Sequence, residues 1–185
     1  MDLIRCFLAI DPGAALRAQL EALHTALVAR FPSPALRWIA PEDYPLTLVF
    51  LGQVRVDEVV RIRECVAAVT PTLAPVRYRL AVARAFPDAQ RPRVLAALPD
   101  DPQPLLRWHA PLAFTLAQAG FAIEHRAYRP HLSLARWKGR PADAQPADLA
   151  LDLEGEARAV TLYESRGGHY WPLFSQRCGR GFRSD

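Results

Sequence analysis

One histidine and two hydroxyl side chains lie in two short segments of similar sequence. The later segment, residues 129–136, reads Arg-Pro-His-Leu-Ser-Leu-Ala-Arg, and the earlier one, residues 44–52, reads Tyr-Pro-Leu-Thr-Leu-Val-Phe-Leu-Gly. Side chains alternate along a strand, so His131 and Ser133 share one face while the neighbouring leucines point to the other. An imidazole that exchanges protons near neutral pH and a hydroxyl that can bind a phosphate oxygen would therefore project together.

The earlier segment repeats this arrangement at every position except that of the histidine. Thr47 stands where Ser133 stands, and Pro45 stands where His131 stands, 86 positions earlier in the chain. Proline has no N–H and is tolerated at the first residue of a strand, so Pro45 can begin a strand without disrupting it. It cannot transfer a proton, so the exchange affects the chemistry rather than the strand.

The two segments resemble the paired His-x-Thr/Ser motifs of the 2H phosphoesterase superfamily. More closely, the chain resembles the bacterial RNA 2',3'-cyclic phosphodiesterases, also called 2'-5' RNA ligases or LigT-like proteins. Further matching blocks occur in the expected order, at residues 5–11, 37–42, 86–95 and 162–165.

The resemblance implies an α+β fold in which two similar lobes pack antiparallel sheets around a pseudo-twofold cleft, with the helices outside. It implies a hydrolase that opens a 2',3'-cyclic phosphate at an RNA end, or on a small nucleotide, to a phosphomonoester. His131 would be the catalytic acid or base, and Thr47 and Ser133 would bind the phosphate. Arg136 would add positive charge, although alternation from Ser133 does not place it on the same face. The chemistry requires no metal and no cofactor.

Pro45 leaves two classes of function open. Loss of one of two general acid/base groups typically costs about 10²- to 10⁴-fold in rate, which would leave a slow enzyme. The alternative is a module that binds RNA or nucleotide phosphate without turnover. Three other groups, His125, His169 and Tyr44, could supply the missing proton transfer if the fold brings them to the cleft. A deliberate substitution at position 45 would be another explanation for the proline.

Hydrophobic periodicity predicts the elements that must position these residues. We expect helices over residues 14–30, 56–69 and 105–119, and strands over 4–10, 37–40, 46–51, 76–85, 94–98, 157–165 and 170–176, with the second motif in a strand that reaches about Trp137. The Pro- and Ala-rich residues 139–148 read as a surface excursion. The prediction is a single bilobal domain over residues 1–185.

Composition is compatible with a phosphate ligand. The formal net charge is +4, and Lys138 is the sole lysine among 23 basic residues. Arginine binds phosphate through a planar fork, although the genome's base composition would also favour arginine. The three cysteines are far apart, which favours reduced thiols and a cytoplasmic location. No apolar run is long enough for a membrane helix. We expect the protein to be a monomer.

Overall fold

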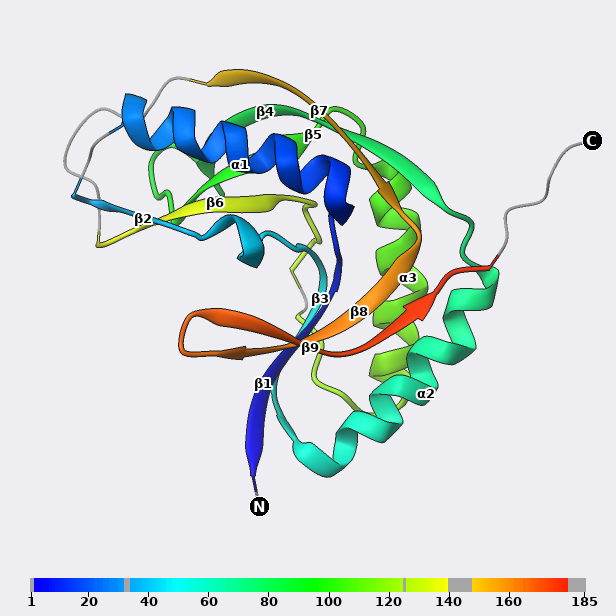
Figure 1. Cartoon of the computed structure of the whole chain (residues 1–185). Helices are drawn as coiled ribbons and strands as arrows, with labels where there is room; N and C mark the ends of the chain where they lie inside the picture. Colours follow the sequence, from blue (N-terminus) through cyan, green and yellow to red (C-terminus); the bar gives the residue numbers. More distant parts are fainter. Residues whose placement is uncertain (1, 32–33, 125, 140–147, 180–185) are drawn as a thin grey trace, which may run out of the picture.

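Two antiparallel sheets form the centre of the molecule (Figure 1). The computed structural model describes residues 2–31, 34–124, 126–139 and 148–179. The first sheet has the order β3 (Leu46–Arg55), β1 (Leu3–Ile10), β8 (Ala159–Arg166) and β9 (His169–Arg177). The second has the order β2 (Leu36–Trp38), β6 (Leu132–Trp137), β5 (Val94–Pro99), β4 (Val76–Phe86) and β7 (Leu149–Ala157). The two motif strands, β3 and β6, thus belong to different sheets.

The helices lie on the outside of the two sheets (Figure 1). Helix α1 (Gly13–Arg30) packs against β7 of the second sheet, although it follows a strand of the first. Helix α3 (Gln103–Gln118) contacts β3 of the first sheet, and α2 (Val59–Val69) contacts α3 and β9. Helix α1 therefore covers the second sheet while α2 and α3 contact strands of the first, and the predicted α+β class is confirmed.

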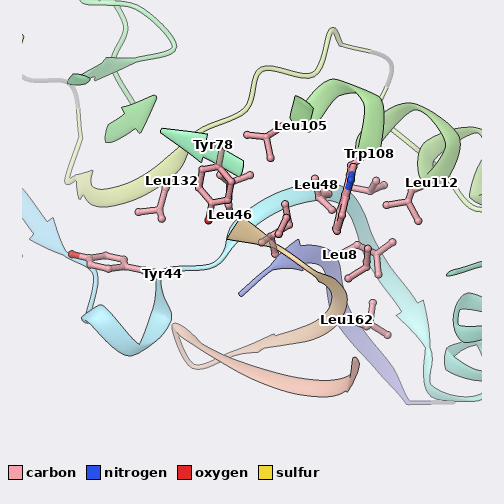
Figure 2. Close-up of a cluster of buried hydrophobic side chains, with 14 of the residues drawn as sticks. Leu8, Tyr44, Leu46, Leu48, Tyr78, Leu105, Trp108, Leu112, Leu132 and Leu162 are labelled. Atoms are coloured by element: carbon pink, nitrogen blue, oxygen red, sulfur yellow. The ribbon is translucent and has the colours of Figure 1, made fainter. Parts of the chain in front are cut away.

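The main hydrophobic core of the described residues lies between the sheets and helices. Leu16, Leu20 and Leu27 form the buried stripe of α1, at the spacing that predicted the helix. Trp108 of α3 is almost fully buried, beside Leu48 of β3 and Leu112 of α3 in Figure 2, and its indole N–H donates to the Ala74 carbonyl at 3.0 Å. This polar contact satisfies the only hydrogen-bonding group of the indole ring.

Most expected elements are present, with two differences. Strand β7 was not predicted, although its alternation of Leu149, Leu151 and Leu153 with more exposed residues is a strand pattern. It follows residues 139–148, which were predicted to be a surface excursion and of which 140–147 lie outside the described part of the chain. The expected helix over 56–69 begins with a separate 3₁₀ turn, η2 (Val56–Glu58), before α2. Among the described residues, no helix is long and apolar enough to cross a membrane.

Candidate active site

The structure relates the two motif segments by strand register. Thr47 of β3 lies opposite Ala9 of β1, and Ser133 of β6 lies opposite Ala96 of β5. In both cases the motif strand pairs with a strand that precedes it across an intervening helix, α1 in the first half and α3 in the second. The two hydroxyl residues therefore occupy equivalent places in the two sheets, and so do the residues two positions before them, Pro45 and His131.

Each motif strand also carries a β-bulge directly after its hydroxyl residue. The pairing skips Leu48 in β3 and Leu134 in β6, so each leucine is an extra residue without a partner across the ladder. A bulge shifts the phase of side-chain alternation. The residues three positions after the hydroxyls, Phe50 and Arg136, consequently return to the same face as the hydroxyls.

The residues on this face surround one pocket of about 300 Å³. It is lined by all four site residues predicted from the sequence, His131, Thr47, Ser133 and Arg136, and by Pro45. The structure brings them together from both sheets. Residues that received no role in the sequence analysis also line it, among them Arg5, Phe7, Arg37, Asp43, Ser165 and Tyr170.

The charged residues described around the pocket are mostly cationic. Arg5, Arg37 and Arg136 line it, against a single carboxylate, Asp43. Arg37 of β2 lies directly across the ladder from Arg136 of β6, which explains why both reach the pocket. Arg5 belongs to the same face of β1 as Phe7. A surplus of guanidinium groups in a concave site favours an anionic ligand such as a phosphate.

His131 is oriented by its own backbone neighbourhood. Its Nδ1 lies 2.8 Å from the Arg129 carbonyl oxygen, which can only accept a hydrogen bond, so Nδ1 carries the proton in the neutral ring. The ring stacks on Phe86 with centroids 4.2 Å apart, and the Arg129 guanidinium lies 4.5 Å from the same phenyl ring. Nε2 is therefore the nitrogen with a free lone pair, as a general base requires.

Burial lowers the pKa of His131 below its ordinary value, and the nearby Arg129 and Arg136 charges lower it further. The hydrogen bond from Nδ1 to the Arg129 carbonyl opposes these effects without cancelling them. The imidazole is consequently neutral at pH 7, in the form that accepts a proton.

If His131 acts as the base in opening a 2',3'-cyclic phosphate, kcat/KM for that reaction will fall as the pH is lowered. The midpoint of the fall will lie below the ordinary histidine pKa of about 6.5. Arg136→Gln should move this midpoint to higher pH, because removing a positive charge raises the pKa of the imidazole. A pH profile of kcat/KM for both proteins checks this. A midpoint above 6.5, or a shift to lower pH in the variant, would contradict the assignment.

On the Pro45 side, a buried carboxylate joins the β8–β9 hairpin to the first motif. Asp43, in the 3₁₀ turn η1 (Pro41–Asp43), accepts a hydrogen bond from the Tyr170 amide at 2.9 Å and contacts His169 Nδ1 at 2.8 Å. The Arg136 guanidinium donates to the Tyr170 hydroxyl at 3.2 Å. These contacts fix one wall of the pocket and one of its arginines.

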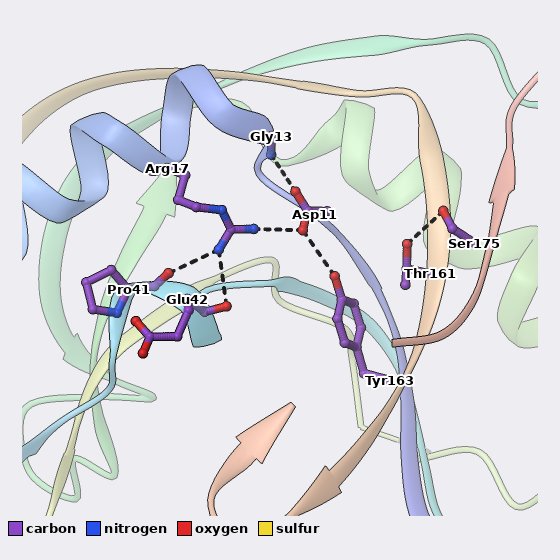
Figure 3. Close-up of polar contacts among 8 residues, drawn as sticks. All are labelled: Asp11, Gly13, Arg17, Pro41, Glu42, Thr161, Tyr163 and Ser175. Atoms are coloured by element: carbon purple, nitrogen blue, oxygen red, sulfur yellow. Dashed lines mark hydrogen bonds and ion pairs between the residues drawn. The ribbon is translucent and has the colours of Figure 1, made fainter. Parts of the chain in front are cut away.

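The η1 turn is also fixed from the side of α1, as Figure 3 shows. The Arg17 guanidinium donates to the carbonyl oxygens of Pro41 and Glu42, at 3.3 and 3.1 Å, and to the Asp11 carboxylate at 2.7 Å. The Tyr163 hydroxyl donates to the same carboxylate at 3.2 Å. The segment that leads into Pro45 is therefore held by side chains from both the helix and the first sheet.

Replacing Asp43 by alanine should destabilise the protein by about 1–3 kcal/mol, because the Tyr170 amide and the His169 ring both lose their partner. Asp57→Ala is a suitable control, since Asp57 pairs with Arg55 at an exposed position and its loss should change the stability much less. Urea unfolding of both variants tests the difference. Equal losses would show that the hairpin is not held through Asp43.

Three groups were considered as substitutes for the missing histidine. The two that the structure describes, Tyr44 and His169, do not line the pocket. Tyr44 is buried, and its hydroxyl contacts His24 Nδ1 at 2.8 Å, away from the pocket. His169 lies beside Asp43 but is not a lining residue. His125 lies outside the described residues.

Known proteins resemble this chain in sequence and in structure. Residues 10–96 match the family model described as LigT like Phosphoesterase. Over these residues the chain resembles LigT-like phosphoesterases. The matched region contains the first motif, whereas the second motif lies beyond residue 96 and is related to the first by the register described above.

A curated relative and two solved structures also resemble this chain. The RNA 2',3'-cyclic phosphodiesterase of Bacillus subtilis (strain 168) is 32% identical over 117 residues, which is 63% of each chain and less than two thirds of the relative. The protein TT0787 of Thermus thermophilus has a TM-score of 0.80 at 24% identity, covering 97% of this chain and 100% of that one. E. coli LigT, solved with 3'-AMP, has a TM-score of 0.75 at 23% identity, covering 96% and 99%. The structural matches confirm the fold.

Proposed function

We propose that this protein hydrolyses 2',3'-cyclic phosphates at RNA ends, or on small nucleotides, to phosphomonoesters. The observation that supports the proposal is the gathering of His131, Thr47, Ser133 and Arg136 in one arginine-rich pocket. The family match and the name of the Bacillus subtilis relative support the same reaction class. The functional unit we propose is a single bilobal domain over residues 1–185.

In the proposed reaction His131 activates water. Nε2 removes a proton from the water as its oxygen forms a bond to phosphorus, and the bond from phosphorus to one ribose oxygen breaks. The hydroxyls of Thr47 and Ser133 donate hydrogen bonds to the non-bridging oxygens, where negative charge accumulates in the transition state. Arg136, held by Tyr170, balances that charge.

The departing ribose oxygen leaves on the opposite side of phosphorus from the attacking water. Position 45 directly precedes β3 as position 131 directly precedes β6, and both line the pocket, so a histidine at position 45 would be placed to protonate this oxygen. Pro45 cannot, and the leaving oxygen takes its proton from water instead. We therefore expect turnover that is slow for this chemistry, by about 10²- to 10⁴-fold.

The position of Pro45 favours a second candidate function. Because Pro45 lines the pocket at the place equivalent to His131, the same residues could bind a phosphate without turning it over. Such a protein would bind RNA or nucleotide phosphate through its arginines and hydroxyls.

One experiment separates the two functions. An RNA oligonucleotide that ends in a 2',3'-cyclic phosphate is incubated with the protein, the product is analysed for a terminal phosphomonoester, and affinity is measured by calorimetry. Product formation supports the hydrolase, and binding without product supports the binding module. If neither occurs, both functions are wrong. The same oligonucleotide ending in a free 3'-hydroxyl is the control ligand.

A further inference from the structure

The carbonyl groups at the β3 bulge are held by a tyrosine and a histidine. β3 is the edge strand of its sheet, so one of its edges has no neighbouring strand among the described residues. On this strand the Tyr128 hydroxyl donates to the Thr47 carbonyl oxygen at 2.7 Å, and His109 Nδ1 donates to the Leu48 carbonyl oxygen at 2.8 Å. Two consecutive carbonyls, one of them on the bulged residue, are therefore bound by side chains from the second half of the chain.

Tyr128 and His109 also support one another. Their rings stack with centroids 4.2 Å apart and an interplanar angle of 15°. His109 belongs to the packed helix α3, and Tyr128 lies three residues before His131. The stack thus connects a rigid helix, the second motif and the bulge of the first motif.

The bulge of the other motif has a comparable set of contacts. The Leu134 carbonyl accepts a hydrogen bond from the Ile39 amide at 3.0 Å, and the Tyr44 hydroxyl lies 3.5 Å from it. Tyr44 in turn contacts His24, which belongs to α1. A tyrosine next to each motif, paired with a histidine on a helix, thus reaches the bulge of the opposite motif.

We propose that His109 and Tyr128 are positioning residues for the Thr47 hydroxyl, an inference that rests on the proposed role of Thr47 in binding phosphate. The phase shift at Leu48 places Thr47 and Phe50 on the pocket face together, and strict alternation would separate them. The two side chains bind the carbonyls on either side of this shift. Loss of either bond leaves a carbonyl unpaired and lets the strand relax, which moves the Thr47 side chain.

A double-mutant cycle tests the Tyr128 contact. Tyr128→Phe keeps the stacked ring but removes the hydroxyl, and it should lower kcat/KM for the cyclic phosphate about 5- to 30-fold. In a Thr47→Ala background the same change should cost less than about 2-fold, because no hydroxyl remains to be misplaced. Equal losses in the two backgrounds would overturn the proposal.

Two controls separate positioning from a general loss of structure. Tyr78→Phe removes another buried hydroxyl, one that has no partner among the described residues, and should leave kcat/KM unchanged. His109→Asn keeps a donor near the place of Nδ1 and should retain more activity than His109→Ala. If the two His109 variants are equally impaired, the bond to Leu48 is not the cause.

The proposal can fail separately from the proposed function. If the protein does not turn over the cyclic phosphate, the same cycle is measured as affinity for inorganic phosphate by calorimetry. Tyr128→Phe should then weaken binding about 5- to 30-fold in the parent and less than about 2-fold with Thr47→Ala. Equal weakening in the two backgrounds, or no binding of phosphate at all, would overturn the positioning role.

Discussion

His131→Ala is expected to lower kcat/KM for a 2',3'-cyclic phosphate by about 10²- to 10⁴-fold. His131 is the imidazole placed in the pocket among the described residues, its Nδ1 is occupied by the Arg129 carbonyl, and its Nε2 is free to accept a proton. Because position 45 is a proline, no second histidine described around the pocket can also transfer a proton. Steady-state hydrolysis of the RNA oligonucleotide measures the loss.

His131→Asn is the matched control for this prediction. An asparagine side chain can donate from near the position of Nδ1 to the Arg129 carbonyl, but it has no titratable group in place of Nε2. The asparagine variant should therefore be as inactive as the alanine variant while its unfolding free energy stays closer to that of the parent. Substantial activity in the asparagine variant would mean that position 131 orders the loop and does not transfer protons.

Pro45→His is expected to raise kcat/KM, by up to about 10²- to 10⁴-fold. Position 45 directly precedes β3 as position 131 directly precedes β6, and each stands two residues before a hydroxyl that lines the same pocket. A histidine there can protonate the ribose oxygen that leaves. The pH profile of kcat/KM should also become bell-shaped, because one imidazole must be neutral and the other protonated.

Pro45→Ala separates the imidazole from the removal of the proline ring. Alanine restores the backbone N–H at the start of β3 without adding a group that transfers protons. It should leave the rate close to that of the parent chain. If Pro45→His were no faster than Pro45→Ala, the leaving oxygen would not depend on an acid at position 45.

The sequence alone was sufficient for the fold class and for most of the elements. Alternation and helical spacing located the strands that carry Thr47 and Ser133 and the three helices, because these patterns reflect which side chains must be buried. The repeat of the two motif segments also located His131, Pro45 and both hydroxyls. Within each segment these positions are only two residues apart, so a short pattern is enough to recognise them. These short-range patterns need no knowledge of which strands pair.

The tertiary structure decided the rest of the pocket, because pairing between distant segments determines it. Arg136 faces the pocket only because a bulge shifts β6 against β5 at Leu134, and no local pattern specifies that shift. Arg5 reaches the site because β1 pairs with the motif strand β3, and Arg37 reaches it because β2 pairs with the motif strand β6. The direction of Tyr44 into the core and the orientation of His131 likewise depend on partners that only the folded chain brings within reach.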